Sequence, residues 1–312
     1  MNLPRWNRLT GFFWWRRRPA VDGSEAAYHA SSAKISELLA SPSACAIGKV
    51  GTTELMGLEY LYRRIQLPWP AAASWRRPAQ RLHDCSGLFP VRRDIFLRWA
   101  EELRAALRQM DVLAQWQTPE TYLSLVEDEA LARLAPQASR AHRNFIHPLH
   151  PPAPWLGVLT RLRWLVIHPF AKTIQAQLPH LAGLGVYPEG SGPELASRAK
   201  DTLTLACPQF SYMVPPRHPD WCAALAELKK GMEALDFDIA LIGAGAWSLP
   251  LAAHAKKIGR KAIHLGGTTQ LLFGIRGGRF DQWGFDYHQH WIRPLAEETP
   301  ANCQLMEKGA YW

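Results

Sequence analysis

The sequence of 312 residues lacks the features that define several classes of protein. No apolar run reaches the roughly 20 residues that a membrane-spanning helix requires, and the apolar centre of the N-terminal segment is too short for a signal peptide. The five cysteines are odd in number and widely spaced, and no pair has Cys-x-x-Cys spacing. This pattern argues against both a disulfide framework and a zinc cluster, so we expect a reducing, cytoplasmic environment.

Common catalytic signatures are missing as well. The sequence has no nucleophile elbow and no Ser-His-Asp ordering, so covalent hydrolase chemistry has no support. The turn Gly243-Ala-Gly245 has Ser248 where the dinucleotide fingerprint requires a third glycine. No acid follows the next strand, where His264 and two glycines stand instead of a ribose-binding Asp or Glu. The two absences disfavour an NAD-type ligand but leave a turn suited to phosphate.

Acidic residues are the minority charge. The 36 Lys and Arg outnumber the 27 Asp and Glu, which gives a net charge of +9 and indicates an anionic partner. No basic run belongs to a recognisable nucleic-acid module, which argues against nucleic acid as that partner. The segment 1–22 reads as a basic, aromatic tail with no acid before Asp22. Its first 20 residues fit peripheral contact with the inner face of a membrane, and a loosely ordered tail is the equal alternative.

Short apolar runs alternate with helical patterns along most of the chain. Since each expected strand is continuously apolar, both faces of the sheet must be covered. The sequence therefore predicts an α/β fold: a Rossmann-like, doubly wound, mainly parallel sheet with helices on both faces. We expect one domain over 23–312, with a helical, Pro-rich insertion around 66–155. The expected strands cover 44–50, 164–167, 202–206, 238–242 and the run that ends at His264.

Glycine and hydroxyl residues follow three of these strands. Such strand-to-helix turns bring backbone N–H groups to an anionic ligand. The nearest basic residues are Lys49, Lys172 and Arg276. Two alternatives stay open: the glycines serve only tight packing, and Thr268 only caps a helix. As phosphate-binding residues we predict Gly51, Thr52, Thr53, Gly243, Gly245, Ser248 and Lys172, and as sugar-binding residues His264, Gly266, Gly267, Thr268, Thr269 and Gln270.

Taken together, these segments resemble the bacterial glycosyltransferases of the GT-D fold type. The resemblance spans roughly 44–312, and the block 243–276 is its most specific part. It is carried by Ala46–Leu55, Val166–Gln175, Ala206–Gln209, Gly243–Leu251, His264–Arg276, and the closing residues from Trp291 to Trp312.

The resemblance implies a Rossmann-like sheet that binds a nucleotide-sugar, commonly a UDP-hexose. It implies transfer of the hexose to a glycan or lipid-linked acceptor, in the biosynthesis of surface polysaccharide or glycoprotein. In that family an Asp-x-Glu motif after an early strand binds a divalent metal, Mn²⁺ or Mg²⁺. Glu54 matches the glutamate of that motif, as catalytic residue and metal ligand, whereas Thr52 stands in the place of the aspartate.

The threonine at position 52 leaves other functions open. A single carboxylate holds a metal less well than two, so the chain is also compatible with a metal-independent transferase. A non-catalytic nucleotide-sugar-binding or membrane-adaptor relative is a further alternative, as is another Rossmann-type enzyme that uses a dinucleotide or S-adenosylmethionine. No catalytic base is singled out; Glu189, Glu194 and Asp286 lie in loop-like segments.

Overall fold

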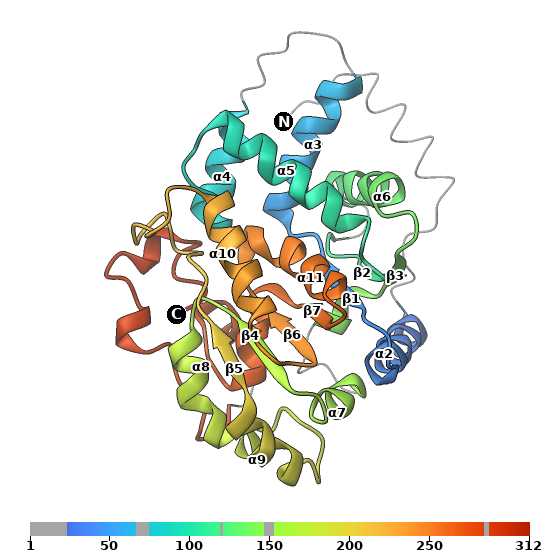
Figure 1. Ribbon diagram of the computed structural model, residues 1–312, viewed down its shortest axis with the longest axis vertical. Helices are drawn as coiled ribbons and strands as arrows, with labels where there is room; N and C mark the ends of the chain where they lie inside the picture. Colours follow the sequence, from blue (N-terminus) through green and yellow to red (C-terminus); the bar gives the residue numbers. More distant parts are fainter. Residues whose placement is uncertain (1–23, 67–74, 119–120, 147–152, 284–286) are drawn as a thin grey trace.

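The computed structural model describes residues 24–66, 75–118, 121–146, 153–283 and 287–312 (Figure 1). The predicted tail 1–22 and the candidate base Asp286 lie outside these residues. Among the described residues, no helix combines the length and the apolar character that crossing a bilayer requires.

In the described part of the chain, seven parallel strands form one sheet, which confirms the predicted fold class. The spatial order is β3-β2-β1-β7-β6-β4-β5. The four central strands are short and almost completely buried, as parallel strands covered on both faces should be, and β4 and β6 are entirely apolar. The strands are β1 (Ala46–Lys49), β2 (Val112–Ala114), β3 (Ser139–Ala141), β4 (Trp164–Ile167), β5 (Leu203–Leu205), β6 (Ile239–Ile242) and β7 (Lys261–His264).

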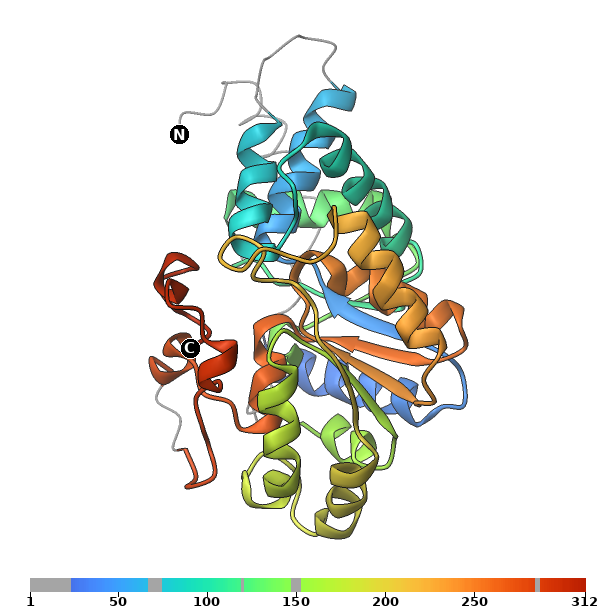
Figure 2. The ribbon, with the colours of Figure 1, turned by 60° about the vertical axis from the view of Figure 1, so that its left-hand side comes forward.

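Two hydrophobic cores lie on opposite faces of the sheet. Alternate side chains of β6 divide between them: Ala240 and Ile242 enter one core, and Ile239 and Leu241 the other. Figure 2 shows helices above and below the sheet. The first core is covered by α3 (Thr52–Gln66), α4 (Arg76–Ser86), α5 (Arg93–Leu107), α6 (Tyr122–Leu134), α10 (Trp221–Glu233) and α11 (Ser248–Lys257). The second is covered by α2 (Glu25–Ala40), α7 (Trp155–Leu159), α8 (Ala171–Gln177), α9 (Gly192–Asp201), and the 3₁₀ helices η2 (Leu178–Gly183) and η4 (Gly266–Phe273).

Local sequence signals fix several helix starts. Ser24 caps α2, where its hydroxyl accepts a hydrogen bond from the Ala27 N–H at 3.2 Å. Asp220 caps α10 in the same way, through the Ala223 N–H at 2.8 Å. Each cap satisfies an N–H group that the first turn of a helix leaves without a partner.

The chain leaves two neighbouring strands in opposite directions. Leu55 of α3, which follows β1, packs in the first core, whereas Phe273 of η4, which follows β7, packs in the second. The strands themselves are paired, with Ile47 opposite Ile263. Diverging connections of this kind open a crevice outside the carboxyl ends of the strands. The fold therefore places a ligand crevice between the ends of β1 and β7.

The segment 66–155, predicted as a helical, Pro-rich insertion, contains both helices and strands. It contains helices α4, α5 and α6, and it also contributes the edge strand β3 and its neighbour β2 to the sheet.

Candidate functional site

A cavity of about 370 Å³ lies at the carboxyl ends of β1, β4, β6 and β7. This volume falls within the range of small-molecule sites. Most of the residues predicted for phosphate or sugar binding line it, although they come from distant parts of the sequence. These residues are Gly51 to Thr53, Gly243, Gly245, His264 and Gly266 to Thr268, and Glu54, predicted as catalytic residue and metal ligand, lines the cavity beside them.

Two buried histidines form part of the wall. His168 Nδ1 accepts a hydrogen bond from the Phe170 N–H at 3.0 Å, so the proton of the neutral ring is on Nε2. Burial lowers the pKa of His168 to about 3. Burial, and then the nearby Lys49 ammonium, lower the pKa of His264 to about 3. Both rings are therefore uncharged at neutral pH and serve the cavity as hydrogen-bonding groups rather than as cations.

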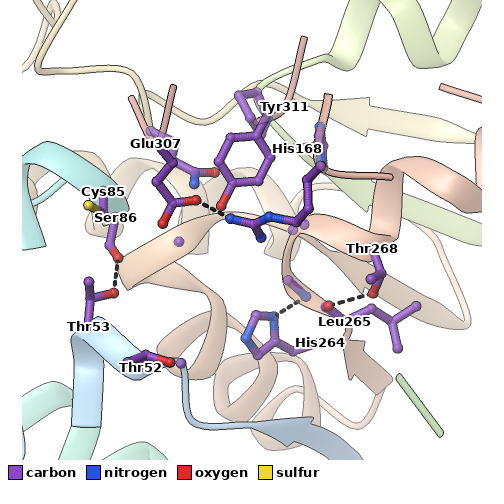
Figure 3. Close-up of a pocket in the computed structure, with 18 of the residues that line it drawn as sticks. Thr52, Thr53, Cys85, Ser86, His168, His264, Leu265, Thr268, Glu307 and Tyr311 are labelled. Carbon is purple, nitrogen blue, oxygen red and sulfur yellow. Dashed lines mark hydrogen bonds and ion pairs between the residues drawn. The ribbon is translucent and has the colours of Figure 1, made fainter. Parts of the chain in front are cut away.

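Glu54 lies in the first turn of α3 and is 9% exposed. Its carboxylate accepts a hydrogen bond from the Thr53 hydroxyl at 3.1 Å. The Thr53 hydroxyl lies 2.7 Å from that of Ser86, at the end of α4 (Figure 3). The carboxylate also lies over Gly51, where a Cβ atom would collide with it. Glu54 is thus fixed at the cavity wall by its own turn and by α4.

Lys49 ends β1 and extends beneath the turn that follows β7. Its ammonium lies 4.3 Å from the centre of the Trp116 ring, a cation–π contact. Burial lowers the pKa of Lys49, an effect that the Glu54 carboxylate opposes. The ammonium therefore lies in a desolvated part of the wall, next to Gly51, predicted to bind phosphate, and Gly266, predicted to bind sugar.

The C-terminal segment closes another side of the cavity. Arg279, in α12 (Gly278–Asp281), forms an ion pair with Glu307. Its guanidinium lies 4.9 Å from the centre of the Tyr311 ring. Figure 3 shows Glu307 and Tyr311 side by side on this wall. Sequence reasoning missed these three residues and named Arg276 instead, because no motif marks them.

Four predicted binding residues lie outside the lining of this cavity. The Ser248 hydroxyl accepts a hydrogen bond from the Ala244 N–H at 2.9 Å. The Thr269 hydroxyl donates a hydrogen bond to the Ile242 carbonyl oxygen at 3.2 Å. Gln270 is fully buried, and its amide donates to backbone carbonyls, including that of Tyr311 at 3.3 Å. The side chain of Lys172 is exposed and pairs with Glu297. The first three shape the turns behind the cavity, and Lys172 is not among the residues that line it.

Other candidate residues are also placed elsewhere. Arg276 stacks on Tyr287, with the guanidinium 4.5 Å from the ring centre. Glu189 and Glu194 are not among the residues that line the cavity.

The residues around Glu54 do not fit a divalent metal. The Thr52 hydroxyl oxygen lies 3.2 Å from the Trp116 indole nitrogen and 3.2 Å from the Gln117 amide nitrogen, so its lone pairs are occupied. Glu307, the other carboxylate of the lining, pairs with Arg279. Mg²⁺ and Mn²⁺ favour several oxygen ligands, and no cluster of three or more His, Cys, Asp or Glu side chains able to hold a metal occurs in the described part of the chain.

Comparisons with known proteins add little. No family model matches the chain, and no curated protein matches it. One similar solved structure is a selenomethionine-substituted domain of unknown function 1792, at 13% identity and a TM-score of 0.37, over 82% of this chain and 87% of that one. Another, described as the highly conserved domain of unknown function 1792 with a distinct glycosyltransferase fold, has 14% identity and a TM-score of 0.31, over 76% and 82%. Similarity at this level carries no inference about function.

Proposed function

We propose that this protein is a glycosyltransferase that moves a hexose from a nucleotide-sugar, a UDP-hexose, to a glycan or glycoconjugate acceptor of the cell surface. The observation that carries the proposal is the cavity itself. At the crevice between β1 and β7 it brings together glycine turns, a desolvated ammonium and the Glu54 carboxylate. Backbone turns and cations suit a diphosphate, and a carboxylate beside them suits proton transfer.

The expected chemistry assigns a role to each group. The acceptor hydroxyl oxygen forms the new bond to the anomeric carbon of the hexose, and the bond from that carbon to the diphosphate oxygen breaks. Glu54 receives the proton of the hydroxyl. The negative charge that develops on the leaving diphosphate is stabilised by Lys49 and by backbone N–H groups of the 266–268 turn, since charge stabilisation is the largest contribution in reactions of this type. His264 and Thr268 contact the sugar from the cavity wall.

Calorimetry and turnover together test this proposal. UDP and UDP-glucose are titrated into wild-type protein and Glu54→Ala, and UDP release from UDP-hexoses is followed in both. We expect both proteins to bind UDP, and we expect the variant to lose turnover by about two to four orders of magnitude, the usual contribution of a general base. Glu101→Ala, at an exposed position of α5, is the matched control and should keep wild-type turnover.

Two results would contradict the proposal. Absence of binding to any common nucleotide-sugar would remove its basis. Binding without turnover in the wild type, with a panel of cell-envelope acceptors supplied, would favour the non-catalytic nucleotide-sugar-binding relative. This second candidate is favoured by Thr52, which stands in place of the metal-binding aspartate and whose hydroxyl is hydrogen-bonded to Trp116 and Gln117.

A further inference from the structure

Two cations approach the same glycine turn from different elements. If Gly266 carried a Cβ atom, it would lie 3.1 Å from Lys49 Cε and 3.3 Å from Lys49 Nζ. A Cβ atom on Gly267 would lie 3.7 Å from Arg279 Nη1. Gly266 has φ +65°, a conformation that glycine adopts without strain. The Tyr311 ring lies nearer to Gly267, with its Cε1 atom 2.7 Å from the same Cβ position. The partly exposed turn therefore lies between an ammonium from β1 and a guanidinium from α12.

Among the described residues, the Lys49 ammonium forms no hydrogen bond or ion pair with a carboxylate. Its close contact is with the Trp116 ring, and the Glu54 carboxylate stabilises its charge only from a longer distance. A desolvated charge without a directly bonded counter-ion is costly. An anion that enters the cavity would remove this cost, so the wall is complementary to a negatively charged ligand.

Arg279 already has an internal anion, Glu307. The pair is about one-third exposed, with side-chain accessibilities of 33% and 32%, so it borders the open part of the cavity. Glu307 and the next residue, Lys308, have φ values of 48° and 60°, which are unfavourable for residues with a Cβ atom. Glu307 is therefore presented to Arg279 by a backbone in an unfavourable conformation, and its carboxylate is paired with the guanidinium that an entering anion would contact.

We propose that Lys49 and Arg279 form a metal-independent diphosphate site across the Gly266-Gly267 turn, in which the entering diphosphate displaces Glu307 from Arg279. This inference rests on the proposed function, since the diphosphate is that of the nucleotide-sugar. Lys49 then supplies the positive charge that the family resemblance assigns to a metal ion. Arg279 supplies a planar fork of donors that matches phosphate oxygens.

A metal site and a cation site predict opposite effects for one substitution. If a metal were held by Glu54 and Glu307, Glu307→Gln would remove a ligand and weaken diphosphate binding. If the cations bind the diphosphate directly, Glu307→Gln removes a competing anion and strengthens binding. If the cations bind the diphosphate directly, Lys49→Met weakens binding, because it removes the positive charge and keeps the length of the side chain.

The test is calorimetry with inorganic pyrophosphate and with UDP, each in EDTA and in Mn²⁺. We expect wild-type protein to bind both ligands equally well in the two buffers. Lys49→Met should weaken binding about tenfold to hundredfold, the range for a hydrogen bond to a charged group, and Glu307→Gln should tighten it. Lys257→Met, exposed on α11, is the matched control for loss of one positive charge and should bind as the wild type does. Lys49→Arg keeps the charge and should stay near wild-type affinity; thermal melts verify that each variant is folded.

The outcomes separate this inference from the proposed function. Pyrophosphate binding in EDTA that depends on Lys49, without any binding of UDP or UDP-hexoses, supports the diphosphate site and overturns the nucleotide-sugar function. UDP binding that requires Mn²⁺, or that is unchanged in folded Lys49→Met, overturns the diphosphate site and leaves the function standing. Weaker binding by Glu307→Gln also overturns it. Binding of neither ligand overturns both.

Discussion

The buried carboxylate of Glu127 should make the protein less stable at neutral pH than at mildly acidic pH. Glu127, on α6, is fully buried and accepts hydrogen bonds from the Trp116 N–H at 2.9 Å and the Gln117 N–H at 3.0 Å. Burial raises the pKa of Glu127 to about 6 from 4.5, an effect that these two hydrogen bonds oppose. The folded protein therefore holds this proton more tightly than the unfolded chain does.

The size and sign follow from this difference in pKa. Because the folded pKa is the higher one, the stability linked to Glu127 is fully present below about pH 4.5 and is lost as the pH rises through 6. A shift of about 1.5 pKa units corresponds to about 2 kcal/mol, of which about 1 kcal/mol is lost between pH 5 and 7.5. The Glu127→Gln variant cannot ionise at this position, so it does not lose this stability. Its free energy of unfolding relative to that of the wild type should therefore rise by about 1 kcal/mol between pH 5 and pH 7.5.

Urea denaturation of both proteins at the two pH values measures this gain. Glu129→Gln, two residues along the same helix, removes a half-exposed carboxylate and reports the general effect of the charge change. The reasoning would be refuted if the difference in unfolding free energy between wild type and Glu127→Gln were the same at pH 5 and pH 7.5. It would also be refuted if Glu129→Gln showed the same change in unfolding free energy between these pH values as Glu127→Gln does.

Three further predictions concern the cavity wall. Gly243→Ala would place a methyl group 2.6 Å from His168 Cδ2. We expect this overpacking to lower the free energy of unfolding by about 1–3 kcal/mol, as measured by thermal or chemical denaturation. Unchanged stability would contradict this. Since the pKa values of His168 and His264 are about 3, an NMR titration should show neither ring gaining a proton between about pH 8 and 5. Trp116→Leu removes the ring that positions the Lys49 ammonium beside the Gly266 turn. Because the ammonium is then no longer held in place for the anion, pyrophosphate binding should weaken about two- to thirtyfold, as measured by calorimetry against wild type.

Apolar runs were the most dependable signal for the fold. The interior strands β4 and β6 are continuous apolar segments, and the structure has them where the sequence predicts strands. Because the carboxyl ends of parallel strands share one edge of the sheet, the turns after β1, β6 and β7 had to converge. The edge strand β3, Ser139-Arg-Ala141, gave no such signal, since it is three residues long and only one of them is buried.

The candidate site was less predictable because polar residues near a turn do not all face it. Thr268 lines the cavity, whereas Thr269 and Gln270 point into the protein. These residues form the 3₁₀ helix η4, in which successive side chains are about 120° apart. Arg279 and Glu307 could not be found from spacing at all, since Arg279 lies in the four-residue helix α12 and Glu307 in a turn, and no repeating pattern joins the two.

The pairing of β1 with β7 has a consequence for how the molecule can be divided. Ala46 lies opposite Ala262 in the middle of the sheet, so the central strand pair joins an early part of the chain to a late one. Bringing such distant segments together requires the closure of a long loop, which only the completed sheet can offset. A truncated piece that ends before β7 would lack both a neighbour for β1 and one side of the crevice. The proposed ligand site therefore depends on the whole sheet, and we expect a screen of shorter fragments to recover no binding.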